Sequence, residues 1–173
     1  MQIRDDLILI ASADKNGGIG KNNTLLQRFE EDMRHFACHT TGHIIIVGRK
    51  TLESFPKGQP LPNRRHFVLS KNPDFSIAGV EVVHNLSDLL KAIESIRDKI
   101  YVCGGESVYK ELLPFCNRAI ITEIDDTFEA DAYLPDILNN PEWICMKPGE
   151  WALSKKGIHY RIQEYERIPG KFI

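Results

Sequence analysis

Short, uninterrupted apolar runs alternate along this chain with short helical segments. Residues 44–47, which read Ile-Ile-Ile-Val, contain no polar position at all. A strand with one face in water alternates apolar and polar residues, whereas a continuous apolar run is typical of a strand covered on both faces, as in a mostly parallel sheet. The sequence therefore predicts an α/β sandwich with a central sheet.

Periodicity places the expected elements along the chain. Strands are predicted at 7–12, 43–47, 66–69, 80–83, 100–103, 119–124, 143–146 and 159–166, and helices at 29–39, 87–96 and 106–113. The second helix begins at a Ser87 cap. The last strand alternates more and follows a turn at residues 155–157, which indicates a terminal antiparallel hairpin. We expect a three-layer sandwich whose central, mostly parallel, eight-stranded sheet ends in that hairpin.

Length and charge limit the other possibilities. With 173 residues, the chain has the length of a single domain spanning residues 1–173. The net charge of −2 gives no reason to propose nucleic acid or an anionic membrane as a partner. No apolar run has the length of a transmembrane helix, and residues 1–6 lack the pattern of a secretion signal. These features favour a cytoplasmic protein.

The cysteines and histidines do not indicate a metal site. The four cysteines show no CxxC or zinc-type spacing, so we expect reduced thiols that are mostly small core residues. His35, His39 and His43 recur every four residues, but the helix is expected to end by residues 40–42 and no carboxylate joins them at ligand spacing. An exposed polar helix face explains these histidines, and no metal is predicted.

Asp32 falls on the apolar face of the first predicted helix. Phe29, Met33 and Phe36 follow the i, i+4, i+7 spacing of a core-facing stripe. Asp32 lies three residues after Phe29 and four before Phe36, within that stripe. A buried ionised carboxylate is costly without a partner, so Asp32 is a candidate ligand-binding acid. The alternatives are a third acid complementing the helix dipole or an internal pair with an arginine.

Three loops follow predicted strands at the edge of the sheet where ligands collect. Residues 48–51 and 70–72 offer adjacent basic and hydroxyl side chains, and residues 104–107 begin a helix with a glycine pair. Together they suggest an anionic nucleotide, with Arg49 and Lys71 flanking an extra phosphate. The chain lacks GxGxxG and the Walker pattern, so neither a standard Rossmann site nor a P-loop is supported.

Several motifs occur in an order and spacing that together are far more specific than any one of them. They are Ile10-Ala11-Ser12 leading to Gly18-Ile19-Gly20, Asp32 with Met33 and Phe36, Val47-Gly48-Arg49-Lys50-Thr51, Pro60-Leu61-Pro62-Asn63-Arg64, Leu69-Ser70, Gly104-Gly105-Glu106-Ser107-Val108-Tyr109 and Thr122-Glu123-Ile124. In these motifs the chain resembles the dihydrofolate reductases, over nearly its whole length from Leu9 to about Glu166.

The resemblance implies NADPH-dependent reduction of 7,8-dihydrofolate to tetrahydrofolate, with a hydride going to C6 and a proton to N5 of the pterin. Asp32 would accept hydrogen bonds from the pterin, with a pKa raised by desolvation, and Thr122 would support it. Arg64 would hold the glutamate carboxylate of the substrate. The substrate pocket would comprise Ile10, Ala11, Leu25, Asp32, Met33, Phe36, Phe55, Leu61, Arg64, Cys103, Tyr109 and Thr122. For each apolar member taken alone, ordinary core packing is the simpler interpretation.

The resemblance also implies a cofactor site. Arg49, Ser70 and Lys71 would bind the 2′-phosphate of NADPH, and residues 104–107 the diphosphate. The full set would be Ala11, Ile19, Gly20, Gly48, Arg49, Lys50, Thr51, Leu69, Ser70, Lys71, Cys103, Gly104, Gly105, Glu106, Ser107, Val108 and Tyr109. Gly17-Gly18 would give a mobile covering loop, and Gly104-Gly105 is a candidate for a cis peptide bond. Antifolate inhibitors and a monomeric state are also implied.

One position departs from the family pattern. Gln27 stands where the family commonly has a tryptophan, so a rigid indole and its N–H donor are missing near the acid. This puts the water network around Asp32 in question, but not the reaction class. Two alternatives stay open: a pterin or pyrimidine reductase of the same fold, and a non-catalytic folate- or nucleotide-binding module.

Overall fold

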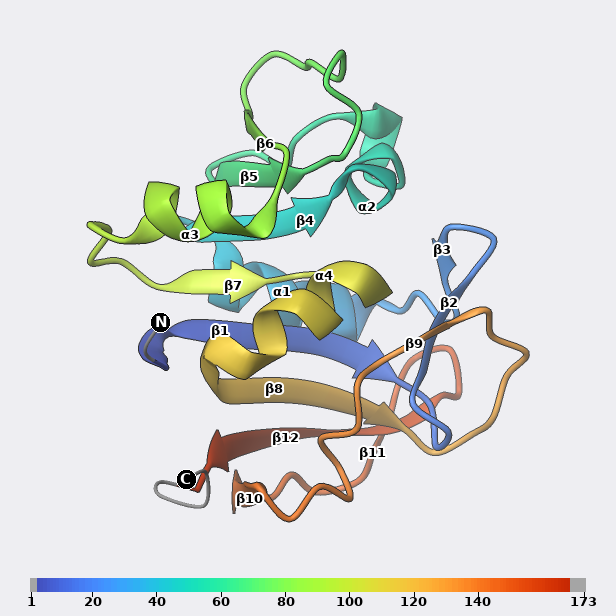
Figure 1. The fold of residues 1–173 in the computed structure, drawn as a ribbon. Coiled ribbons are helices and arrows are strands. Elements are labelled where there is room, and N and C mark those ends of the chain that lie inside the picture. Colours follow the sequence, from blue (N-terminus) through green and yellow to red (C-terminus); the bar gives the residue numbers. More distant parts are fainter. Residues whose placement is uncertain (1–2, 169–173) are drawn as a thin grey trace.

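The computed structural model describes residues 3–168. The domain expected over residues 1–173, and the segment 1–6 considered above, therefore lie partly outside the described residues. All eight predicted strands are present, and they form one sheet in the order β10-β12-β8-β1-β7-β4-β5-β6 (Figure 1). Their bounds are β1 (Arg4–Ala13), β4 (Ile44–Gly48), β5 (Arg65–Leu69), β6 (Glu81–Val83), β7 (Ile100–Val102), β8 (Cys116–Ile124), β10 (Trp143–Lys147) and β12 (His159–Arg167).

The sheet is mostly parallel, as predicted. The strands from β8 through β1, β7, β4 and β5 to β6 pair in parallel, whereas β12 pairs antiparallel with both β8 and β10. A short strand, β11 (Ala152–Leu153), pairs antiparallel with β12 across the predicted turn at residues 155–157. The terminal antiparallel hairpin is therefore confirmed.

Helices cover both faces of the sheet (Figure 1). They are α1 (Glu30–Thr40), α2 (Arg49–Glu53), α3 (Leu86–Ile93) and α4 (Glu106–Leu112), with 3-10 turns η1 (Pro56–Gly58) and η2 (Leu113–Phe115). One apolar cluster joins the sheet to α3 and α4, and a second joins it to α1 and α2. No helix within residues 3–168 is long and apolar enough to cross a membrane.

The run at residues 44–47 shows why a continuous apolar sequence suits this position. Ile44 and Ile46 belong to the cluster under α3 and α4, whereas Ile45 and Val47 belong to the cluster under α1 and α2. Successive side chains of a strand point to opposite faces, and here both faces are covered. The three-layer architecture is thus confirmed.

Several short elements were not predicted from the sequence. A second sheet has the order β3-β2-β9 and contains β2 (Gly18–Lys21), β3 (Thr24–Leu25) and β9 (Ala132–Tyr133). Two of these strands have only two residues each, too few for any periodicity. Residues 48–51, which were expected to form a loop, instead begin α2 at Arg49.

The expected cap of the second predicted helix was wrong. α3 begins at Leu86, and its capping residue is Asn85, whose side-chain oxygen accepts a hydrogen bond of 2.9 Å from the backbone N–H of Asp88. The Asn85 amide also donates to the Asp88 carboxylate at 2.7 Å. Ser87 lies inside the helix, where its hydroxyl does not cap. The helix ends at Ile93, three residues earlier than the predicted 96.

Replacing Asn85 with alanine is expected to lower the free energy of unfolding by about 1 kcal/mol, the usual effect of losing a capping side chain. Ser87→Ala serves as the matched control, with an expected change within about 0.5 kcal/mol because the residue is exposed and does not cap. Urea unfolding of both variants measures the two values. A larger loss for Ser87→Ala than for Asn85→Ala would contradict the assignment.

The cysteines are free, as predicted, and three of the four lie in or pack against the apolar clusters. Only Cys116 is buried, whereas Cys103 and Cys145 are half-buried and Cys38 is exposed on α1. Cys38 is the exception, because cysteine packs as a small apolar residue on average, which does not fix its place on a given helix.

Candidate active site

Asp32 is buried, in the first turn of α1. Its residue is 8% exposed, while Met33 and Phe36 on the same helix are half-buried. Phe29 immediately precedes the helix and is 1% exposed, with its ring 5.0 Å from that of Tyr160. The predicted apolar stripe is therefore present, with an acid inside it.

Burial changes the acidity of this carboxyl group. Desolvation raises the pKa of Asp32, because the ionised form is poorly solvated among apolar neighbours. A hydrogen bond from the Thr122 hydroxyl on β8 acts in the opposite direction and is the smaller effect. The direction matches the expectation from sequence, and the contact with Thr122 joins α1 to the sheet.

A second buried carboxylate, Asp14, provides a contrast and was missed from sequence. Its two oxygens accept hydrogen bonds of 2.8 to 2.9 Å from the backbone N–H groups of Asn16, Gly18 and Phe128. Asp14 thus holds together the turn that leads from β1 into β2. The Asp-x-x-x-Gly pattern of that turn was the available signal, and it indicates a structural carboxylate rather than a ligand-binding one.

Most of the predicted substrate-pocket residues lie on one face of the sheet. Ile10 is a buried member of the cluster under α1 and α2, and Phe36, Phe55, Leu61 and Cys103 pack against it. Leu25 lies instead in the small second sheet and is 48% exposed. The structure therefore brings together an apolar wall beside Asp32, contributed by β1, α1, β7 and the segment that follows α2.

Ala11 and Tyr109 belong to the cluster on the opposite face. The phenol of Tyr109 crosses between the layers and donates a hydrogen bond of 2.8 Å to the carbonyl oxygen of Ile10. Burial raises the pKa of Tyr109, so the phenol keeps its proton and stays a donor. A ligand bound on the α1 side of the sheet would therefore contact the backbone of Ala11 and not its methyl group, which points to the other side.

Arg64 lies at the far end of α1 from Asp32. Its guanidinium donates to the hydroxyls of Thr40 at 2.8 Å and Thr41 at 3.1 Å, and to the Pro62 carbonyl at 2.9 Å. The guanidinium carbon also lies 5.9 Å from the ring centre of Phe36. Thr40, a buried residue that sequence reasoning missed, therefore orients the arginine along the apolar wall.

The three strand-end loops meet at one edge of the sheet, as predicted. Pairing of Gly48 with Leu69 and of Ile46 with Val102 aligns the carboxyl ends of β4, β5 and β7. The Gly48 N–H donates to the Gly104 carbonyl at 2.8 Å, which ties two of the loops together. These loops carry the predicted cofactor set of Gly48, Arg49, Lys50, Thr51, Leu69, Ser70, Lys71 and 104–109.

The glycine pair before α4 is closely surrounded. The Gly104-Gly105 peptide bond is cis, as expected from the resemblance. A Cβ at Gly104 would lie 3.1 to 3.2 Å from the ring and hydroxyl of Tyr109, and the φ of +104° also disfavours a side chain there. A Cβ at Gly105 would lie 3.3 Å from the Thr51 hydroxyl. Both positions are therefore too crowded for an ordinary side chain, which favours glycine at each.

The polar side chains of these loops differ in their exposure and in whether they already have a partner. Arg49 pairs with Glu53 one turn along α2 at 2.6 Å, while Lys50 and Lys71 are exposed. Ser70 is buried, and its backbone N–H donates to Val83 at 2.9 Å. Arg49 and Lys50 thus lie in the first turn of α2, and both α2 and α4 begin without a side-chain cap.

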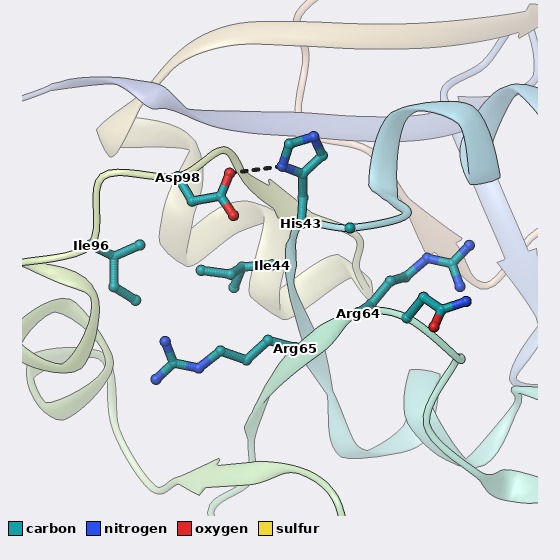
Figure 2. Close-up of a pocket in the computed structure, with 8 residues that line it drawn as sticks. His43, Ile44, Arg64, Arg65, Ile96 and Asp98 are labelled. Atoms are coloured by element: carbon teal, nitrogen blue, oxygen red, sulfur yellow. Dashed lines mark hydrogen bonds and ion pairs between the residues drawn. The ribbon is translucent and has the colours of Figure 1, made fainter.

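One hollow lies elsewhere, at the amino ends of β4 and β5 (Figure 2). It measures about 380 Å³ and contains the His43–Asp98 pair, whose atoms are 2.7 Å apart. Arg64 and Arg65 extend in opposite directions from it in Figure 2. Because ligands in α/β sheets bind at the carboxyl ends of strands, we do not place the active site in this hollow.

The histidine series does not form a metal centre. The rings of His35 and His39 are edge-to-face with centres 4.6 Å apart, and burial lowers the pKa of His35 to about 4. Among residues 3–168, no group of three or more His, Cys, Asp or Glu side chains is arranged to hold a metal ion.

Comparison with known proteins shows the family of this chain. The sequence model of the family described as "Dihydrofolate reductase" matches residues 6–167. The chain belongs to the dihydrofolate reductase family. The dihydrofolate reductase of Mycobacterium tuberculosis is 38% identical over 162 residues, covering 92% of this chain and 96% of that protein. The Bacillus subtilis dihydrofolate reductase is 35% identical over 159 residues, covering 91% and 92%.

A solved dihydrofolate reductase is also similar in three dimensions. The structure of the Enterococcus faecalis dihydrofolate reductase, complexed with NADP(H) and RAB-propyl, has a TM-score of 0.83 and 30% sequence identity. The alignment covers 93% of this chain and 95% of that one. The family assignment therefore rests on sequence and on fold independently.

Gln27, where the family commonly has tryptophan, lies beside a separate hollow. This hollow measures about 350 Å³ and is lined by Gln27, Ile124, Asp125, Asp126, Phe128, Gly157, Ile158 and His159. Asp32 is not among the lining residues. Gln27 therefore lies next to the end of β8 and the hairpin turn before β12, and the departure noted from sequence has a defined location.

Proposed function

We propose that this member of the dihydrofolate reductase family reduces 7,8-dihydrofolate to tetrahydrofolate, with hydride transfer to C6 and protonation at N5, in one-carbon metabolism. The observation that carries the proposal is a buried carboxyl with a raised pKa, Asp32, beside an apolar wall and three loops converging on one sheet edge. NADPH, when bound, supplies the hydride.

Asp32 orients the pterin ring in this proposal. Its carboxylate accepts hydrogen bonds from the pterin amino group and a ring nitrogen, which fixes the ring against the apolar wall. The Thr122 hydroxyl restrains the carboxyl through the contact described above. Because its pKa is raised, Asp32 carries or shares a proton more readily than a solvent-exposed aspartate, which favours proton delivery to N5 through a water.

The apolar wall excludes bulk water and holds the rest of the substrate. Phe36, Phe55 and Leu61 contact one cluster, which suits the flat benzoyl group. Arg64 lies beyond Phe36 with its planar fork restrained by Thr40, so it suits the glutamate carboxylate. The resulting order of acid, apolar wall and arginine matches the pterin, benzoyl and glutamate parts of dihydrofolate.

The loop residues fit NADPH. The glycine pair is closely held, because a Cβ at either position would meet Tyr109 or Thr51, and the uncapped first turn of α4 offers amides for the diphosphate. Arg49, Ser70 and Lys71 would hold the 2′-phosphate. Ile19 and Gly20 on β2 would cover the nicotinamide end, with Gly17-Gly18 as the mobile part of that cover.

Arg49→Ala is expected to weaken NADPH binding about 10-fold while changing NADH binding less than 2-fold, because only NADPH carries the 2′-phosphate. Fluorescence titration with both coenzymes measures the effect. Arg34→Ala is the matched control, since Arg34 forms the same type of one-turn pair with Glu30 on α1. Equal weakening of both coenzymes would argue against the 2′-phosphate assignment.

Turnover distinguishes the proposal from its alternatives. Loss of NADPH absorbance on adding dihydrofolate is expected at ordinary enzyme rates, which a non-catalytic binding module would not show. A pterin reductase of the same fold would turn over a tailless pterin as efficiently as dihydrofolate, whereas Arg64 predicts a clear preference for the substrate with the tail. We further propose a cytoplasmic monomer with one domain, inhibited by antifolates, with no nucleic acid or membrane partner.

A further inference from the structure

Ser12, near the carboxyl end of β1, has a buried hydroxyl without a hydrogen-bond partner among the described residues. Ile8 and Ile10 on the same strand belong to the apolar cluster under α1 and α2. Because alternate residues of a strand face the same side, the Ser12 side chain faces the side occupied by α1. On the face of the sheet that α1 covers, Ser12 is therefore the next side chain of β1 after Ile10. Asp32 belongs to α1 and lies on this same side of the sheet.

The pairing of the strands places this hydroxyl beside the acid. Ser12 is directly opposite Thr122 on β8, and Thr122 shares its face with Ile120 of the same cluster. Neighbouring strands of a sheet lie about 4.8 Å apart, and these two residues are partners in the parallel register of β1 and β8. The Thr122 hydroxyl is bonded to Asp32, so Ser12 lies next to that pair without joining it.

An unpaired buried hydroxyl is unfavourable relative to a paired one, so its presence beside a binding acid requires an explanation. A hydroxyl both donates and accepts, which suits a ring edge that presents nitrogen and oxygen atoms. Gln27, by contrast, lies at the separate hollow at the end of β8. Ser12 is thus a hydroxyl beside Asp32 whose hydrogen bonding the protein itself does not satisfy.

We propose that the Ser12 hydroxyl is a positioning group that hydrogen-bonds the bound pterin, directly or through one ordered water, on the side of the ring held by Asp32. This inference rests on the proposed role of Asp32 as the pterin-binding acid. It assigns to this chain a second polar contact for the pterin, provided by the sheet, in addition to the carboxyl provided by α1.

The test combines ligand affinity with the stability of the ligand-free protein. Ser12→Ala is expected to weaken folate binding about 5- to 10-fold, measured by fluorescence titration, with NADPH binding changed less than 2-fold. The melting temperature of the ligand-free variant should stay equal or rise, because the substitution removes an unpaired buried hydroxyl. If Ser12 had a purely structural role, the substitution would instead lower the melting temperature and leave folate affinity unchanged.

Ser154→Ala is the matched control for that reverse pattern. Ser154 is also buried, but its hydroxyl accepts a hydrogen bond of 2.9 Å from the Ile158 N–H, so its loss should lower the melting temperature and leave folate affinity unchanged. The inference on Ser12 is overturned if Ser12→Ala keeps folate affinity within 2-fold, or if its loss is confined to NADPH.

Asp32→Asn separates this inference from the proposal on which it rests. If Asp32→Asn weakens folate binding and Ser12→Ala does not, only the role of Ser12 is wrong. If neither substitution weakens folate binding, the assignment of Asp32 as the pterin-binding acid fails as well, and the role of Ser12 is overturned with it.

Discussion

Replacing Asp32 with asparagine is expected to lower the rate of dihydrofolate reduction by about 10²- to 10⁴-fold, the range typical of losing a positioned acid–base group. Asparagine has nearly the same shape, so the apolar wall and the cofactor loops should be retained. The amide cannot carry or share the proton that the raised pKa of Asp32 makes available. Steady-state rates with NADPH and dihydrofolate measure the loss, and activity equal to the parent would contradict the proton-delivery role.

The same substitution is expected to stabilise the ligand-free protein at neutral pH. Burial raises the pKa of Asp32 above its unfolded value, so the folded state binds the proton more tightly than the unfolded chain does. That favourable contribution is complete below the unfolded pKa and is lost as the pH rises through the folded pKa. Asp32→Asn should therefore melt higher than the parent at pH 7 to 8, with a smaller difference near pH 4.

Asp14→Asn is the control for this stability effect. The Asp14 carboxylate accepts three backbone N–H hydrogen bonds, and an amide offers only one acceptor oxygen in its place. This variant should melt lower than the parent, opposite in sign to Asp32→Asn. If both variants melt lower at pH 8, Asp32 also has a structural role in the ligand-free protein.

Arg64→Leu is expected to raise the KM for dihydrofolate by roughly 30- to 150-fold, which corresponds to about 2 to 3 kcal/mol for a charged hydrogen-bonded pair. The guanidinium is already oriented by Thr40 and by the Pro62 carbonyl, so little order has to be gained on binding. Turnover of a pterin without the glutamate tail should change less than 2-fold, because that substrate has no carboxylate for Arg64 to hold.

The adjacent arginine provides the control. Arg65 extends in the opposite direction in Figure 2 and pairs with Glu81 at 2.5 Å on the exposed side of β5. Arg65→Leu should leave the KM for dihydrofolate within 2-fold. Equal losses for both substrates with Arg64→Leu would indicate that Arg64 shapes the pocket through Thr40 rather than binding the tail.

Local patterns predicted most of the architecture. Eight of the nine strands of the main sheet and its terminal hairpin follow from apolar runs and turn residues, which act over neighbouring positions. The same patterns failed for β3 and β9, which are too short to show a period, and for the cap of α3, where Asn85 and Ser87 are both good capping residues. Choosing between two nearby caps depends on where the helix packs.

The sequence by itself determined that Asp32 lies within an apolar helical face and that three loops follow buried strands, because helix and strand periods fix which residues share a face. Only the tertiary structure decided what those residues meet. Asp32 meets Thr122, Arg64 meets Thr40, and Ser12 is placed beside Thr122 with its hydroxyl unpaired. These contacts join segments far apart in the chain, and they form when helices pack onto a sheet whose strand order and register no local period specifies.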